Sequence, residues 1–150
     1  MTNVRDNNLN WFGKMKALVL AGGFAKRLGP IGEQIPKAML PTEGDTLLNH
    51  ILRKLEKEGI EAIISTNKRF EPFFREYKNI IVEEVTREEE KLGAVSAIDY
   101  AIKRVGIDDA LLVICVDNYF SSDLHGFISG FEGVPQVGIY YMGERPDMLS

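Results

Sequence analysis

Short apolar runs alternate along this chain with longer stretches in which apolar residues recur every three or four positions. The short runs are rich in β-branched residues and are bounded by residues that break regular structure, a pattern typical of strands in a buried sheet. The pattern predicts strands over residues 16–20, 60–65, 79–83, 110–116 and 136–142.

Helical periodicity fills the intervals between these predicted strands. One helix is expected to end at Gly59 and another, starting at about residue 92, at Gly106, because glycine is common just after the last helical turn. Shorter helices are predicted over about 69–77 and 121–131. Strands that alternate with helices build a mostly parallel sheet covered on both faces. The predicted fold class is therefore α/β, a Rossmann-like three-layer α/β/α arrangement.

Length and charge narrow the possible functions. The 150 residues suit one domain, which we place at 15–150, with the polar, asparagine-rich residues 1–14 as a flexible N-terminal extension. A net charge of −4 and a pI near 5.3 argue against a nucleic-acid partner, which would need a basic face. No segment approaches the ~20 apolar residues of a membrane span or shows an export signal. The lone Cys115 is expected to be a buried apolar residue, which suits a cytoplasmic protein.

The connection after the first predicted strand is the most informative part of the sequence. It runs from Gly22 to about Asp45, far beyond the usual ~2–6 residues of a strand-to-helix loop, and it is rich in glycine, proline and cations. Bare backbone amides and positive charge at the carboxyl end of a parallel strand are typical of a phosphate site. The loop lacks both Gly-x-Gly-x-x-Gly and Gly-Lys-Ser/Thr, so the dinucleotide and Walker classes are excluded. Asp117 ends another predicted strand at the same edge.

Three ordered motifs make the assignment more specific. They are Leu20-Ala21-Gly22-Gly23-Phe24-Ala25-Lys26-Arg27-Leu28 with Pro36-Lys37, then Leu92-Gly93-Ala94-Val95-Ser96-Ala97, then Val116-Asp117-Asn118. Together they resemble the signature of sugar-1-phosphate nucleotidyltransferases of the glucose-1-phosphate thymidylyltransferase and mannose-1-phosphate guanylyltransferase type. Lys26, Ala94-Val95 and Val116 depart from the family pattern, which has threonine, Thr-Ala and glycine there.

The resemblance implies a role for each matching residue. Arg27 and Lys37 would hold the phosphates as catalytic cations, and Asp117 would be the catalytic ligand of Mg²⁺. Gly93 would let the base approach the backbone. The other implied nucleotide-binding residues are Leu20, Ala21, Gly22, Gly23 and Lys26.

Structural or surface roles for these residues remain open as alternatives. Asp117 is equally typical of a helix cap or turn, and cations such as Arg27 and Lys37 are usually surface residues. Glu84 is a candidate acceptor for a base amino group, the alternative being a solvated carboxylate. His50 and His125 are expected to be structural or surface residues.

The implied reaction transfers a nucleoside monophosphate from a nucleoside triphosphate to a sugar 1-phosphate, with release of pyrophosphate. The resemblance covers about residues 15–142, so the acceptor half of the family's catalytic domain is expected to be missing. The alternatives are a nucleotide-binding homologue or fragment without transferase activity, and an enzyme for inositol phosphate or phosphocholine. A homo-oligomer is a further possibility that the sequence leaves open.

Overall fold

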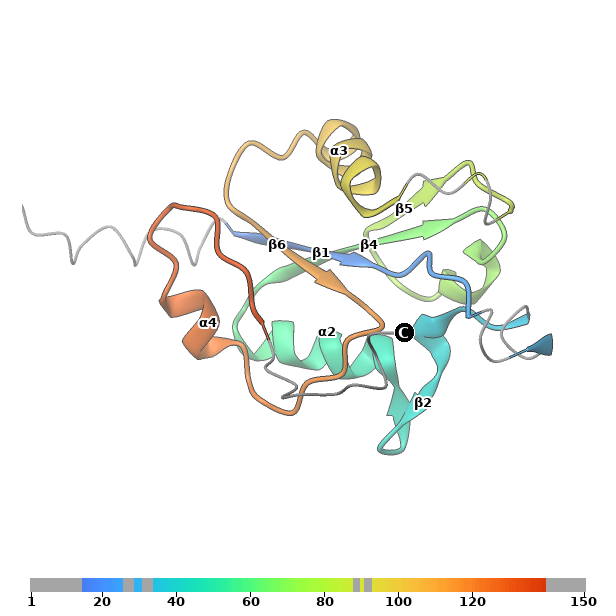
Figure 1. Ribbon diagram of the computed structural model, residues 1–150, viewed down its shortest axis with the longest axis horizontal. Helices are drawn as coiled ribbons and strands as arrows, with labels where there is room; N and C mark the ends of the chain where they lie inside the picture. Colours follow the sequence, from blue (N-terminus) through green and yellow to red (C-terminus); the bar gives the residue numbers. More distant parts are fainter. Residues whose placement is uncertain (1–14, 26–28, 31–33, 88–89, 91–92, 140–150) are drawn as a thin grey trace, which may run out of the picture.

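A parallel sheet forms the centre of the protein. The computed structural model describes residues 15–25, 29–30, 34–87, 90 and 93–139. The strands of the central sheet are β1 (Lys16–Leu20), β4 (Glu61–Asn67), β5 (Ile80–Glu83) and β6 (Leu111–Cys115). They lie in the order β5-β4-β1-β6 and every neighbouring pair is parallel (Figure 1). The proposed extension over residues 1–14 lies outside the described residues.

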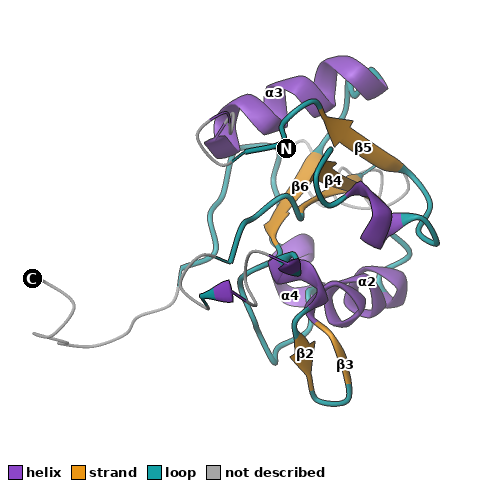
Figure 2. Cartoon of the chain, turned by 90° about the vertical axis from the view of Figure 1, so that its right-hand side faces the viewer, coloured by secondary structure: helices purple, strands orange, loops and turns teal. Residues whose placement is uncertain are grey.

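Helices cover both faces of this sheet. Helices α2 (Leu47–Lys57) and α4 (His125–Ser129) lie on one face, and α3 (Gly93–Val105) lies on the other (Figure 2). The predicted three-layer, Rossmann-like α/β/α fold is therefore confirmed. Among the described residues, no helix is long and apolar enough to cross a bilayer.

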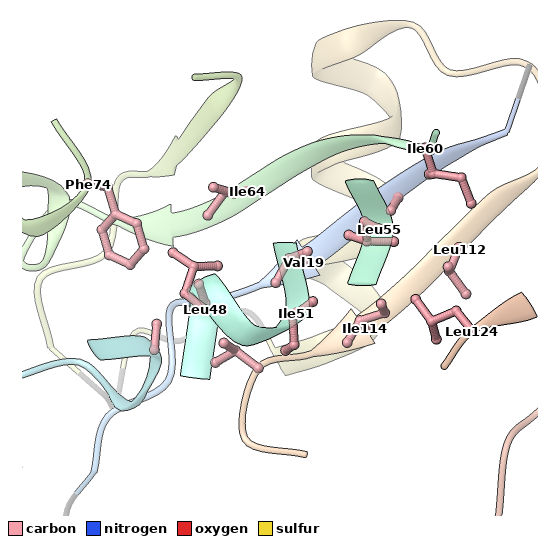
Figure 3. Packing of buried hydrophobic residues seen from close by; sticks show 14 of the residues in the cluster. Val19, Leu48, Ile51, Leu55, Ile60, Ile64, Phe74, Leu112, Ile114 and Leu124 are labelled. Carbon is pink, nitrogen blue, oxygen red and sulfur yellow. The ribbon is translucent and has the colours of Figure 1, made fainter. Parts of the chain in front are cut away.

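The larger core lies between α2 and the sheet. Leu48, Ile51 and Leu55 occupy one side of α2 and are fully buried against strand residues that include Val19 and Ile64 (Figure 3). Full burial of one such side chain contributes about 1.5–3 kcal/mol. On the other face, Leu18, Ile63 and Ile81 pack with Ala101 of α3. The two cores fix the strands whose carboxyl ends form the site below.

Three predicted elements differ from the structure. The helix expected over 69–77 is only the 3-10 helix η3 (Glu71–Phe74), which has proline in its first turn. The helix expected over 121–131 is limited to α4, which ends at Ser129 and has Gly130 as its C-cap. Residues 136–139 do not form the expected fifth strand; Gln136 donates from Nε2 to the carbonyl of Phe127 at 2.8 Å, which joins this segment to α4. Residues 140–142 of that prediction lie outside the described residues.

The long connection after β1 contains regular structure that the sequence pattern did not predict. It includes a 3-10 helix η2 (Lys37–Met39) and a hairpin of β2 (Pro41–Thr42) and β3 (Asp45–Thr46). The turn between the two strands places Glu43 at φ 46° and Gly44 at φ 83°. Two consecutive left-handed residues are typical of the tight turn that joins antiparallel strands. This hairpin delivers the chain directly into α2.

A polar network joins the hairpin to α2. Thr46 caps the helix by accepting from the Asn49 backbone at 3.1 Å, and Asp45 Oδ1 accepts from the Asn49 side chain at 2.7 Å. Asp45 also accepts from the Thr46 backbone at 2.7 Å and pairs with Arg53. The hydrogen bond from Asn49, followed by those from Thr46 and Arg53, lowers the pKa of Asp45.

The lowered pKa predicts a pH-dependent contribution to stability. Because folding depresses the pKa, the Asp45 carboxylate stabilises the fold at pH values above its ordinary pKa of 3.8, and this contribution is lost as pH falls through the lower pKa of the folded state. We expect Asp45→Asn to be less stable than the parent chain at pH 7, with the difference shrinking toward pH 3. Urea unfolding at several pH values measures it. Asp99→Asn, which breaks the exposed Asp99–Lys103 pair of α3, is the control and should show a smaller change.

Candidate functional site

The strand register brings distant residues to one edge of the sheet. Leu20 lies opposite Ser65 on β4 and Cys115 on β6, and Asn67 lies opposite Glu83 on β5. Leu20 and Cys115 are the last paired residues of β1 and β6. Gly22 lies two residues after Leu20 and Asp117 two residues after Cys115, so both lie at the same carboxyl edge. The next strand of this sheet along the chain, β4, pairs with one side of β1, and the last strand, β6, pairs with the other side. Such a switch point is where open α/β sheets bind ligands.

A cavity of about 240 Å³ opens at this edge. It collects residues from β1, β4, β5, β6, η2 and the first turn of α3. The predicted site residues among its lining are Leu20, Gly22, Gly23, Lys37, Gly93 and Asp117. Ala21 does not line it; this residue is buried, and its N–H donates to the carbonyl of Ser65 at 2.7 Å. Lys26 and Arg27 lie outside the described residues.

Lys37 and Asp117 form the charged end of the cavity. Lys37 Nζ lies 3.3 Å from Asp117 Oδ2, although 80 positions separate the two residues in the sequence. The backbone N–H of Lys37 also donates to the carbonyl of Gly23 at 3.4 Å. Both side chains are partly exposed, 35% for Lys37 and 50% for Asp117, so an entering ligand can reach them. A cation and an anion are therefore presented together beside the glycine turn.

Asn67 holds this glycine turn in place. Its side chain is buried, Nδ2 donates to the carbonyl of Gly22 at 2.9 Å, and Oδ1 accepts from the backbone of Phe70 at 3.0 Å. Both ends of the amide are thus used within the protein. Asn67 was not predicted from the sequence. The available signal was a run of polar residues, Ser65-Thr66-Asn67, directly after the apolar centre of the strand.

Helix α2 anchors the loop that carries Asp117. His50 Nε2 lies 2.9 Å from the carbonyl of Phe120, and the ring of His50 stacks on Tyr119 with centroids 4.8 Å apart. Lys54 Nζ donates to the carbonyls of Ser121 and Ser122 at 2.9 and 2.7 Å. His50 is therefore structural, as expected, and it positions the segment that follows Asp117.

The hairpin contributes to the same anchor. A hydrogen bond with Glu43, reinforced by burial and by the charge of that carboxylate, raises the pKa of the Tyr119 hydroxyl. Asp117 lies in the turn that follows β6, in agreement with the turn alternative, and it does not cap α4. The N-cap of α4 is Leu124, which makes no side-chain capping bond. Asp117 is instead left facing the cavity.

Small residues line the opposite end of the cavity. Gly93 opens α3 with φ 74°, a backbone conformation that suits glycine, and nothing lies within 4 Å of where its Cβ would be. Ala94, Ala97 and Val85 supply apolar surface next to it. Glu83 also lies here and is buried, whereas Glu84 is exposed. Cys115, expected to be buried, is only half-buried and lines the cavity.

The carboxylates of the cavity suit a metal site that is completed by a ligand. Within the part of the chain that the structure describes, no three or more Asp, Glu, His or Cys side chains gather around a point where a metal ion would fit. Of the two carboxylates that line the cavity, Asp117 lies at the end that holds Lys37, and Glu83 comes from β5. Mg²⁺ is commonly held by one or two carboxylates together with phosphate oxygens and water, so Asp117 suits Mg²⁺ brought in with a triphosphate.

Comparison with known proteins decides the family. The profile of the Nucleotidyl transferase family matches residues 16–146. The chain belongs to this family. A D-glycero-alpha-D-manno-heptose 1-phosphate guanylyltransferase of Aneurinibacillus thermoaerophilus is 30% identical over 73% of the chain and 49% of its own length. The bifunctional protein GlmU of Methanocaldococcus jannaschii is 31% identical over 76% of the chain and 28% of its own length.

Solved structures of nucleotidyltransferases have the same fold. A Bacillus anthracis protein described as a glucose-1-phosphate thymidylyltransferase superposes with a TM-score of 0.64 at 27% identity, covering 76% of this chain and 48% of that one. A CTP:phosphocholine cytidylyltransferase of Streptococcus pneumoniae superposes with a TM-score of 0.54 at 23% identity, covering 74% and 48%. The latter likeness concerns the fold alone. The chain thus spans about half the length of these nucleotidyltransferases, or less.

Proposed function

We propose that this nucleotidyltransferase chain binds a nucleoside triphosphate with Mg²⁺ along the carboxyl edge of its sheet. The reaction transfers the nucleoside monophosphate to a sugar 1-phosphate and releases pyrophosphate. The acceptor oxygen attacks the α-phosphorus, and the bond to the bridging oxygen of the leaving pyrophosphate breaks. Mutual repulsion of two polyanions and charge on the leaving group oppose this step.

The residues of the cavity can reduce both the repulsion between the substrates and the charge on the leaving group. The backbone at Gly22 and Gly23 leaves room for phosphate oxygens, and Lys37 supplies a cation beside it. Mg²⁺, held by Asp117 and the phosphates, would neutralise charge and orient the triphosphate. Arg27 and Lys26 are proposed as further phosphate contacts on the motif alone. Leu20 and Ala21 form the strand end from which the loop departs.

The observation that carries the proposal is the convergence of Lys37 and Asp117 at 3.3 Å in this cavity. Each side chain has a partner of opposite sign and remains partly exposed. A triphosphate with its metal offers each side chain a new partner of opposite charge: a phosphate for Lys37 and a cation for Asp117. The pair is therefore suited to exchange its internal contact for contacts with the bound nucleotide.

The acceptor class rests on the relatives. The Aneurinibacillus protein is named for a heptose 1-phosphate and the Bacillus protein for glucose 1-phosphate, which favours a sugar 1-phosphate here. Inositol phosphate and phosphocholine remain the alternative acceptors.

A pyrophosphate-release assay tests the proposal. The chain would be incubated with each nucleoside triphosphate, Mg²⁺ and a panel of sugar 1-phosphates, with phosphocholine and inositol phosphate included. We expect release that requires both a sugar 1-phosphate and Mg²⁺. Release with only a non-sugar acceptor would reassign the substrate. Nucleotide binding without any release would leave a binding protein and overturn the transferase.

A further inference from the structure

A buried carboxylate lies at the end of the cavity away from Lys37. Glu83 is only 8% exposed, and its Oε1 accepts a hydrogen bond from Ser65 Oγ at 3.0 Å. Both residues line the cavity. Side chains alternate along a strand, so Glu83 faces the cavity with Ile81 and Val85 on the α3 side, while Glu84 is exposed to solvent. Glu84 is the candidate that the sequence offers for a base contact, but Glu83 is the residue placed to make one.

The position of Glu83 fits a base and does not fit a phosphate. Strands lie about 4.8 Å apart, so the three steps from β5 to β6 separate Glu83 from Asp117 by roughly 14 Å. A phosphate group beside Glu83 would meet like charge. With the phosphates at the Lys37 and Asp117 end, the nucleoside extends along the strand ends and its base reaches Glu83.

A carboxylate can discriminate between bases by the hydrogen-bond donors that each base presents. It accepts only, and Ser65 satisfies one of its several lone-pair positions. An ionised group left buried without donors is costly. A ligand that fills this end of the cavity must therefore direct N–H groups at Glu83, preferably two side by side to match both carboxylate oxygens.

Guanine is the base that offers this pair, through N1–H and the 2-amino group. Adenine and cytosine place a ring acceptor beside their amino group, and uracil and thymine place carbonyls on either side of their single N–H. An unsatisfied or repelled buried group penalises these four bases. We infer that Glu83 is the specificity-determining residue of the site and selects GTP. This inference rests on the proposed function, because it takes the cavity to be the triphosphate site.

The remaining walls suit the same base. Val85, Ala94 and Ala97 provide apolar contact for the faces of a flat ring. The first turn of α3 has backbone N–H groups that no carbonyl within the helix can accept, which suits the O6 acceptor next to N1–H. Gly93 adds no side chain between ring and backbone.

Calorimetric titration of the full chain with nucleotides and Mg²⁺ tests the inference. GTP, ATP, CTP, UTP, dTTP and inosine triphosphate are the probes. We expect GTP to bind tightest and inosine triphosphate, which lacks only the 2-amino group, to bind at least about tenfold more weakly. In Glu83→Gln, which replaces one acceptor oxygen with a donor, the ratio of GTP to inosine triphosphate affinity should fall to near one. Glu84→Gln, the exposed neighbour, is the matched control and should keep the parental ratio.

The outcomes separate this inference from the proposed function. Binding of another triphosphate as tightly as GTP, or equal affinity for GTP and inosine triphosphate, overturns guanine selection while the triphosphate site stands. Binding of no triphosphate overturns the proposed function itself. The comparison of GTP with inosine triphosphate uses the unaltered chain, so it decides the matter even where Glu83→Gln fails to fold.

Discussion

Replacing Lys37 with methionine is expected to lower the rate of pyrophosphate release by about 10²–10³, because a preorganised cation is lost from the developing charge of the transition state. Methionine keeps the aliphatic stem beside Gly23, where Lys37 Cδ lies 3.6 Å from the position of an added Cβ. The Lys37–Asp117 pair is partly exposed, so the free energy of unfolding should change by less than about 1 kcal/mol. Steady-state kinetics and urea unfolding measure the two effects.

Lys16→Met is the matched control. Lys16 forms a similar exposed ion pair with Glu61, at 3.1 Å, but at the amino end of the sheet. Its loss should leave the reaction rate unchanged. Equal rates for Lys37→Met and the parent chain would contradict the role proposed for Lys37 at the phosphates.

Replacing Asp117 with asparagine should abolish the effect of Mg²⁺ on triphosphate binding. The variant keeps the shape and one oxygen of the side chain but removes the charge that a hard cation requires. We expect Mg²⁺ to tighten triphosphate binding to the parent chain by at least about tenfold, a coupling of about 1.4 kcal/mol, and to have little effect on the variant. Titrations of triphosphate with and without Mg²⁺ measure the difference.

Asp123→Asn, an exposed carboxylate further along the same loop, is the control and should retain the Mg²⁺ effect. An Asp117→Asn chain that still responds fully to Mg²⁺ would remove the metal from this residue. Thermal unfolding of both variants checks that the loop anchored by His50 and Lys54 remains folded.

The sheet could be predicted from sequence because its strands are short apolar runs separated by helical periodicity. Their spatial order was not predicted, since periodicity reports burial and does not report which strands pair. The fifth strand was wrong over residues 136–139 because β-branched residues do not by themselves indicate burial. Val137 and Ile139 are β-branched, yet they are 81% and 90% exposed in the structure. Strand propensity depends on a partner and a covering layer, which this segment lacks within the described residues.

The site was predicted where a motif combined glycine with charge, and it was missed where a contact depends on folding. Lys37, Asp117 and Gly93 were identified from such motifs, and the structure places them in one cavity. Their roles in binding and catalysis remain predictions. Glu83 was overlooked in favour of Glu84, although the two-residue period of a strand distinguishes the inward position from the outward one. His50 and Lys54 act on backbone carbonyls far along the chain, which no local pattern reveals.

The order of the strands has a consequence for how the protein opens. The proposed base contact lies at the end of β5 and the proposed metal contact lies just after β6. These are the two outermost strands of the described sheet, while β1 and β4 occupy its interior. Outer strands are the first to separate in local unfolding, and their amides exchange with solvent sooner than those of the interior. A nucleotide that spans the carboxyl edge would contact the ends of both outer strands and of the inner strands at the same time. Its binding should therefore slow amide hydrogen exchange most in β5 and β6, far more than in the strands that contact the glycine turn.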